Sequence, residues 1–98
     1  MAEYQLRDYT IRPGEMDEWL SEWRELVVPL RRKHGFHVAG AWTAGEDRFV
    51  WILAFDGPNA WEEADRAYYE SPERKLMNPD PARHIMESRT SRMKSIDA

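Results

Sequence analysis

The chain has 98 residues, a formal net charge of -4 and no cysteine. That length holds one domain over residues 1–98, with a modest core and no room for a second one. The acidic balance argues against a nucleic-acid partner, and the lack of cysteine excludes disulfides and thiolate chemistry. Nothing at the N-terminus resembles a targeting segment, and the main apolar run is too short to span a membrane. We therefore expect a cytoplasmic protein with no membrane partner.

The N-terminal segment, residues 4–12, mixes β-forming and charged side chains at a period of two and predicts a strand. Arg7 and Tyr9 lie two residues apart and would share one face, with Asp8 on the other. A bulge would exchange these faces, because a shift of one residue turns every side chain over. The sequence leaves both registers open.

The next segment, residues 16–30, carries its apolar side chains in one stripe, which predicts an amphipathic helix. Three cations at 31–33 would stabilise its C-terminus, and Gly35 would end it. Pro29 should distort the last turn, because proline has no amide hydrogen to donate and crowds the carbonyl four residues earlier.

Residues 36–44 alternate as a strand, and a turn at 45–47 joins them to the apolar run 49–55, so the two segments form a hairpin. Both faces of the run are apolar, although about two helices can cover only one face of a small sheet. We expect its smaller side chains to pack against the helices: Val50, Ile52 and Ala54. The larger ones would then face a second subunit: Trp51, Leu53 and Phe55.

After Pro58 the spacing of apolar residues predicts a second helix, and Ser71 would cap a further short turn. The charged final segment, residues 83–96, is typical of an edge strand whose cations discourage further pairing. The elements then follow the order strand, helix, strand, strand, helix, strand. This order predicts an α+β fold, the ferredoxin-like βαββαβ sandwich, with a four-stranded antiparallel sheet and helices on one face.

Four stretches together carry a family pattern: YQLRDYTIRPGEMDEWLSEW, PLRRKHGFHVAGAWTA, FVWILAFDGPNAWEEADRA and HIMESRTSRM. In order and spacing they resemble the NIPSNAP family over nearly the whole chain. The resemblance implies a dimeric α/β barrel, a homodimer formed through the open sheet face. The wider superfamily includes cofactor-free monooxygenases, polyketide cyclases, haem-degrading enzymes and proteins with no assigned reaction. Membership therefore predicts the fold better than the function.

Arg7 and Tyr9 are the candidate catalytic residues, because a guanidinium and a phenol on one strand face could both project between two sheets. Together they could bind a carboxylate or stabilise an enolate. Alternatively, Arg7 pairs with Glu87 or another carboxylate at the subunit interface and Tyr9 only packs. If the register is reversed, Asp8 lines this space instead.

Apolar side chains of the hairpin could wall a ligand pocket between the sheets: Trp42, Trp51, Leu53 and Phe55. The alternative is that this cluster is only the packed core of a dimer. His84 opens the final strand, where it could stand at a pocket mouth or simply be solvated. Glu87 and Arg89 share a face of that strand and could reach either the ligand or an ion pair.

No residue pattern predicts a metal or a cofactor. The spacing His34-x-x-His37 resembles a ligand pair, but Gly35 ends the predicted helix between the two rings and points them apart. Haem-degrading relatives use an asparagine on an early strand, whereas the asparagines here, Asn59 and Asn78, fall at a helix start and in a loop. A glycine-rich phosphate loop is also missing, so we expect no cofactor.

Two functions stay open at this point. The first is a cofactor-free enzyme, an oxygenase, cyclase or isomerase, that acts on an aromatic or acidic organic molecule held between the sheets. The second is a non-catalytic homodimer with a binding or structural role. Loss of turnover at unchanged stability in Arg7→Ala or Tyr9→Phe would favour the first, and equal loss of both properties would favour the second.

Overall fold

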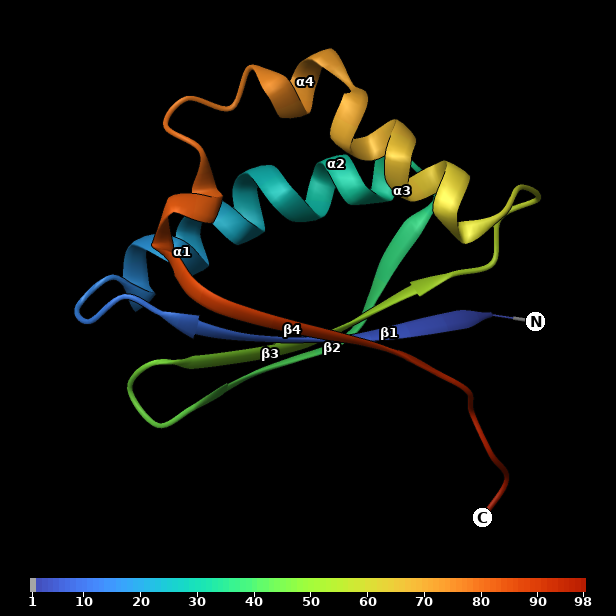
Figure 1. The fold of residues 1–98 in the computed structure, drawn as a ribbon, viewed down its shortest axis with the longest axis horizontal. Helices are drawn as coiled ribbons and strands as arrows, with labels where there is room; N and C mark the ends of the chain where they lie inside the picture. The colour runs from blue at the N-terminus through green and yellow to red at the C-terminus, as the bar shows by residue number, and fades with distance from the viewer. Residues whose placement is uncertain (1) are drawn as a thin grey trace.

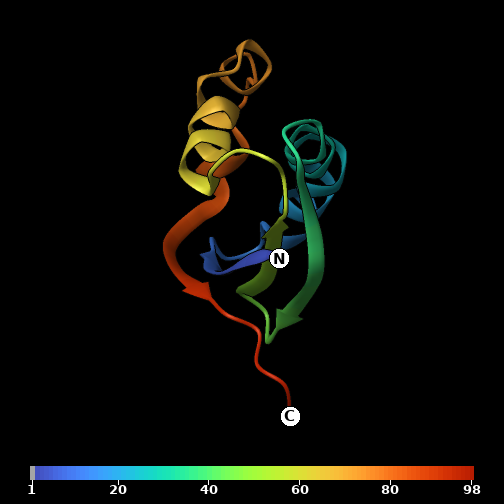
Figure 2. The same cartoon turned by 90° about the vertical axis from the view of Figure 1, so that its right-hand side faces the viewer.

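The computed structural model describes residues 2–98 as one four-stranded antiparallel sheet with helices packed against it. The strands are β1 (Glu3–Ile11), β2 (Phe36–Ala44), β3 (Arg48–Phe55) and β4 (Ile85–Met93). They lie in the order β2-β3-β1-β4, which places β3 and β1 in the centre. Figures 1 and 2 show the helices on one side of this sheet. The predicted ferredoxin-like βαββαβ arrangement is therefore confirmed.

The first helical layer is one long helix built from three segments: α1 (Met16–Glu22), η1 (Trp23–Val27) and α2 (Val28–Lys33). The middle segment is π-helical, because the amide of Val28 donates to the carbonyl oxygen of Trp23, five residues earlier. Pro29 follows directly and has no amide hydrogen to donate to Glu25, so the wide turn lies next to the residue that predicted a distortion. Gly35 follows the helix with a φ of 91°.

The second helical layer consists of α3 (Trp61–Glu70), α4 (Pro72–Lys75) and the 3-10 turn η2 (Pro81–His84). The hydroxyl of Ser71 accepts from the amide of Arg74 at 3.2 Å, which confirms the predicted cap of α4. Figure 2 shows this layer beside the α1–α2 helix, on the same side of the sheet. No helix within residues 2–98 is both long and apolar enough to cross a membrane.

The large side chains of β3 face the helices and form the centre of the core. Trp51, Leu53 and Phe55 are 1%, 0% and 2% exposed, and the indole of Trp23 meets that of Trp51 edge-on at 5.5 Å. The prediction that these three residues face a second subunit is therefore wrong. Large rings from both layers fill the space between a sheet and its helices better than small side chains would.

The opposite face of β3 carries smaller side chains and has no helix over it. Val50 and Ile52 lie there half-buried, so the prediction that they pack against helices is wrong as well. Ala54, next in the same alternation, is fully buried. The open face of the sheet is consequently apolar but lacks the large aromatic set of β3.

A bulge in β2 moves Trp42 to the open face. The pairing register of β2 with β3 shifts between Val38 and Gly40, so one extra residue is inserted there. Before the bulge Phe36 is 2% exposed under the helices, whereas Trp42 after it is 55% exposed. The alternation of residues 36–44 in the sequence predicts that Phe36 and Trp42 share a face; this prediction is wrong, because simple alternation does not count the extra residue.

Candidate functional site

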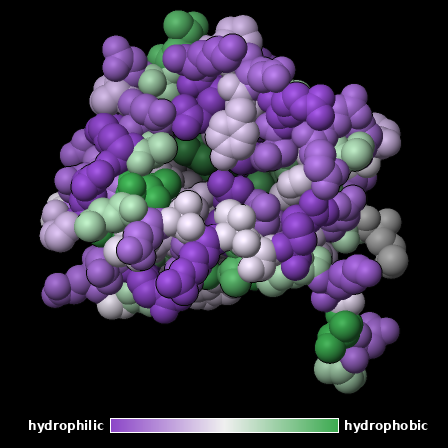
Figure 3. Space-filling model, in the orientation of Figure 1, coloured by the Kyte–Doolittle hydropathy of each residue, from purple (hydrophilic) through white to green (hydrophobic). Residues whose placement is uncertain are grey.

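A cavity of about 340 Å3 lies between the sheet and the helical layers. Its lining includes Arg7, Tyr9 and Trp51 from the two central strands, together with Arg31 from α2 and Tyr69 from α3. Figure 3 shows apolar side chains in the recess between helices and strands, framed by a largely polar surface. A cavity of this size suits a small organic molecule.

Arg7 is held by three neutral oxygen atoms and forms no ion pair with a carboxylate of residues 2–98. Its Nε donates to the Tyr9 hydroxyl at 2.7 Å, its Nη1 to Gln5 at 2.6 Å and its Nη2 to the Tyr69 hydroxyl at 3.2 Å. The guanidinium also lies 5.6 Å from the centre of the Trp51 ring. Burial opposes its charge, but the phenols of Tyr9 and Tyr69 outweigh burial and raise the pKa of Arg7, so it stays a cation.

Arg31 approaches the same cavity from the end of α2, where its side chain is 2% exposed. Its Nη1 donates to Asp65 at 2.7 Å and its Nη2 to the Tyr69 hydroxyl at 3.3 Å. Its guanidinium carbon lies 3.8 Å from the ring centre of Tyr68, and burial raises the pKa of that phenol. The Tyr69 hydroxyl therefore accepts from one guanidinium of the sheet and one of the helices.

The cavity lining is positively charged, although the chain as a whole has a net charge of -4. The lining contains three arginines but only one carboxylate, that of Glu87. Arg31 is already paired, and Arg74 lies 3.1 Å from Asp80. Arg7 has no acidic partner among residues 2–98, so its charge is available to a ligand.

The residues that line the cavity also carry buried donors without acceptors. Nε1 of Trp19, Nε1 of Trp51 and Nε of Arg31 have no hydrogen-bond partner within the described chain. A buried polar group left unpaired costs about 1–3 kcal/mol. A lining of this kind suits a ligand that is rich in acceptor atoms.

The sequence correctly predicted that Arg7 and Tyr9 share a strand face, and the two side chains are hydrogen-bonded. That face is turned toward the helices, however, and not toward a second sheet. Asp8 lies on the open face and pairs with Arg48 at 2.6 Å, so the reversed register is wrong. Within residues 2–98, Arg7 forms no ion pair with Glu87 or with another carboxylate, and a pair across a subunit interface stays a prediction.

The predicted aromatic pocket does not form as a unit. Trp51 lines the cavity, whereas Leu53 and Phe55 lie in the core outside the cavity lining. Trp42 and Arg89 lie on the open face, one after the bulge of β2 and the other on the edge strand β4. The prediction failed because it placed residues from both faces of the sheet in one pocket.

Sequence reasoning missed the helical part of the site. The sequence indicates Arg31 only as a cation near a helix end, and it predicts no site role for Tyr69 or Arg74. A signal was present in the adjacent tyrosines Tyr68 and Tyr69, because neighbouring residues of a helix point about 100° apart and cannot both face the core. One of the two therefore had to stand at the margin of the core.

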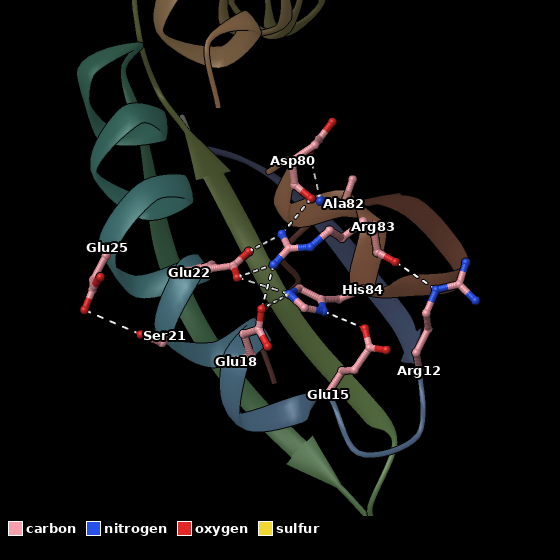
Figure 4. A network of polar contacts seen from close by, with 10 residues as sticks. All are labelled: Arg12, Glu15, Glu18, Ser21, Glu22, Glu25, Asp80, Ala82, Arg83 and His84. Carbon is pink, nitrogen blue, oxygen red and sulfur yellow. Dashed lines mark hydrogen bonds and ion pairs between the residues drawn. The ribbon is translucent and has the colours of Figure 1, made fainter. Parts of the chain in front are cut away.

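A second polar cluster ties α1 to η2 (Figure 4). The His84 side chain is 2% exposed, with Nδ1 2.7 Å from Glu15 and Nε2 3.2 Å from Glu22. Arg83 donates to Glu22 at 2.8 Å and to Glu18 at 2.7 Å. The predictions for His84, a pocket mouth or a solvated ring, are both wrong, since carboxylates enclose it outside the cavity lining.

This cluster is best described as an ion-pair network. Burial lowers the pKa of His84, but hydrogen bonds to Glu15 and Glu22 outweigh burial, so the pKa is raised. Glu18, Glu22 and His84 each offer an atom within 4.8 Å of the others, a spacing that could hold a metal ion. Both ring nitrogens of His84 already meet carboxylates, however, and Arg83 pairs with Glu18 and Glu22.

A larger groove of about 590 Å3 runs between the η1–α2 helix and the loop after α4. It is bordered by the exposed side chains of Leu26 and Leu76 and by the ion pair of Lys33 with Glu73. The ion pair satisfies both charges, so the groove offers less to a polar ligand than the smaller cavity does.

The fold is similar to that of several solved structures. A NIPSNAP family protein from Agrobacterium tumefaciens str. C58 is 17% identical with a TM-score of 0.85, over 99% of this chain and 95% of that one. An uncharacterized NIPSNAP domain protein from Burkholderia xenovorans is 14% identical with a TM-score of 0.83, over 96% and 94%. A candidate antibiotic biosynthesis monooxygenase from Caulobacter crescentus CB15 is 8% identical with a TM-score of 0.72, over 98% and 91%.

At these identities the structural likeness shows the fold alone. No curated protein matches the chain. The NIPSNAP family model matches residues 4–95, which include both the cavity and the ion-pair network. The match confirms the resemblance found in the sequence, and this chain belongs to the NIPSNAP family.

Proposed function

We propose that this protein binds a small organic acid in the cavity between its sheet and its helices, with the anionic group of the ligand at Arg7. The supporting observation is that the Arg7 guanidinium lines the cavity and contacts only neutral oxygen atoms among residues 2–98. A partly buried cation without an anionic partner is unfavourable, and a bound carboxylate or enolate would supply that partner.

The body of the ligand is proposed to be flat and apolar. Aromatic rings supply much of the cavity lining: Tyr9, Trp19, Trp51, Tyr68 and Tyr69. A volume of about 340 Å3 is near the lower end of the range for small-molecule sites. An aromatic acid suits this lining, because its ring can pack against these side chains while its acid group meets Arg7.

The same geometry would support a cofactor-free reaction. Arg7 and the hydroxyl of Tyr9 could stabilise the negative charge of a bound enolate or phenolate, as an oxygenase, cyclase or isomerase of this type requires. The fold shared with a candidate antibiotic biosynthesis monooxygenase supports this finer proposal. A non-catalytic binding protein would use the same cavity and differ only in the lack of turnover.

Replacing Arg7 by glutamine is expected to weaken benzoate binding about tenfold or more, because hydrogen bonds to charged groups contribute about 1.5–3 kcal/mol. Binding of the neutral analogue benzamide should change little, since it carries no charge for Arg7 to meet. Quenching of tryptophan fluorescence can measure both affinities, because Trp51 lies beside the guanidinium.

Arg66→Gln is the matched control, because Arg66 is exposed on α3 and the variant loses the same charge. Equal loss of benzoate binding in both variants would indicate a general charge effect and contradict the proposal. The same two variants, Arg7→Gln and Arg66→Gln, test catalysis. Loss of turnover in Arg7→Gln alone, at an unchanged melting temperature, would favour an enzymatic function over a purely binding one.

We also propose that the open face of the sheet packs against a second copy of this chain. Val50 and Ile52 lie there half-buried, Trp42 is 55% exposed, and no helix of residues 2–98 covers them. Apolar sheet faces of this kind are typical of interfaces between identical subunits.

Ile52→Lys is expected to weaken such a dimer at least about tenfold, because the ammonium would be buried between two sheets. Leu76→Lys, at an exposed residue on the helical side, should leave association unchanged. Sedimentation equilibrium of both variants and the wild type measures the dissociation constants. A wild-type protein that is monomeric at every concentration tested would contradict the proposal.

A further inference from the structure

The hydroxyl of Tyr69 occupies a position at which two guanidinium groups converge. Nη2 of Arg7 donates to it at 3.2 Å and Nη2 of Arg31 at 3.3 Å. The two arginines come from opposite layers, Arg7 from β1 and Arg31 from α2. Two guanidinium groups directed at one point form an arrangement that proteins use to bind carboxylate oxygens.

The Tyr69 hydroxyl makes the longest side-chain hydrogen bond of each arginine. Other hydrogen bonds of the same arginines are shorter: 2.7 Å to Tyr9, 2.6 Å to Gln5 and 2.7 Å to Asp65. Bonds from a guanidinium to an anion measure about 2.7–2.9 Å. Both bonds to Tyr69 are longer than these, so one oxygen shared between two guanidinium groups satisfies each of them only in part.

Tyr69 lies at the margin of the cavity, where solvent reaches its side chain. Its residue is 43% exposed, whereas the adjacent Tyr68 is 2% exposed and fills the core. The Tyr69 ring meets Tyr68 edge-on at 5.0 Å and lies 5.8 Å from the guanidinium of Arg74, at the border of the cavity. An exposed side chain can move to another staggered rotamer without a change of the backbone.

We infer that the ligand carries a carboxylate and that this group displaces the Tyr69 hydroxyl from between Arg7 and Arg31. The inference rests on the proposed function and adds to it the class of the anion and a second cationic partner. Tyr69 acts as an internal competitor for the site. A carboxylate can meet both arginines with charged oxygens, whereas a neutral phenol offers one uncharged oxygen and gains nothing over Tyr69 itself.

Tyr69→Phe tests this inference, because it removes the competing hydroxyl and keeps the ring. Benzoate affinity is expected to rise about 3- to 10-fold, since binding no longer has to break the hydrogen bonds to that hydroxyl. Tyr4→Phe, at a half-buried tyrosine of β1 outside the cavity, is the matched control and should leave the affinity unchanged. Titrations followed by tryptophan fluorescence, with benzoate and with phenol, measure these affinities.

The outcomes separate this inference from the proposed function. Benzoate binding that is lost in Arg7→Gln but unchanged or weaker in Tyr69→Phe would overturn the inference alone, because Tyr69 would then be no competitor. Benzoate binding that Arg7→Gln leaves intact would overturn the proposed function. Absence of benzoate binding in both the wild type and Tyr69→Phe would overturn both. Stronger benzoate binding in Tyr69→Phe, by a larger factor than any gain in phenol binding, is the expected result.

Discussion

Replacing Trp51 by alanine is expected to lower the free energy of unfolding by about 3–5 kcal/mol. Trp51 is 1% exposed, and its ring packs edge-on against those of Trp23 at 5.5 Å and Tyr9 at 6.5 Å. Its removal would leave a void next to the ligand cavity, and packed neighbours relax into such voids only in part. Urea titration followed by circular dichroism measures the change.

Trp42→Ala is the matched control, because it removes the same side chain from the open face, where Trp42 is 55% exposed. Its expected effect is within about 1 kcal/mol. Both substitutions should be compared in the Ile52→Lys background, so that subunit association does not contribute to stability. A larger loss from Trp42→Ala than from Trp51→Ala would contradict the assignment of the two sheet faces.

The order of elements was predictable because its signals are local. The apolar stripe of the first helix, the distortion near Pro29 and the cap at Ser71 each depend on residues a few positions apart. The elements occur in the predicted order, but the final strand, β4 (Ile85–Met93), is shorter than the predicted 83–96, and His84 ends the turn η2 instead of opening that strand. Once the order of elements is known, the preference for short, right-handed and uncrossed connections leaves few sheet topologies. The family resemblance indicated the same ferredoxin-like topology.

The faces of the strands were harder to predict, because alternation shows which residues share a face but not what covers it. In β3 both faces are apolar, and the helices contribute tryptophans of their own that pack with the larger set. In β2 the register changes before Gly40. A Cβ at Gly40 would lie 2.5 Å from the Trp42 ring, so a glycine within a strand was the available signal of the bulge.

The candidate site was predictable only where strand spacing determined it. Arg7 and Tyr9 share a face because they lie two residues apart in a strand. Arg31 and Tyr69 reach the same point only after α2 and α3 have packed over the sheet. No local pattern brings such residues together, and the same is true of His84 and Glu15, which are 69 residues apart in the sequence.

His84→Gln is expected to lower the free energy of unfolding by about 2–3 kcal/mol at mildly acidic pH. The His84 side chain is 2% exposed, whereas those of Glu15 and Glu22 are 38% and 17% exposed. Breaking a fully buried ion pair costs about 3–5 kcal/mol, and the partial exposure of the carboxylates reduces this effect. Arg83 remains in the variant and continues to pair with Glu22.

The pH dependence of this loss follows from two opposite pKa shifts. The pKa of His84 is raised in the folded protein, so its contribution to stability is full below the unfolded value of 6.5 and is lost as pH rises through the folded pKa. The pKa of Glu22 is lowered, first by its hydrogen bond from Arg83, so its contribution is full above 4.5 and is lost at lower pH. The network therefore stabilises the protein most between these two values. Urea titrations over a range of pH should show that the free energy of unfolding of the wild type declines toward alkaline pH, whereas that of His84→Gln does not. Parallel pH profiles of the two proteins would contradict a charged His84 in the folded protein.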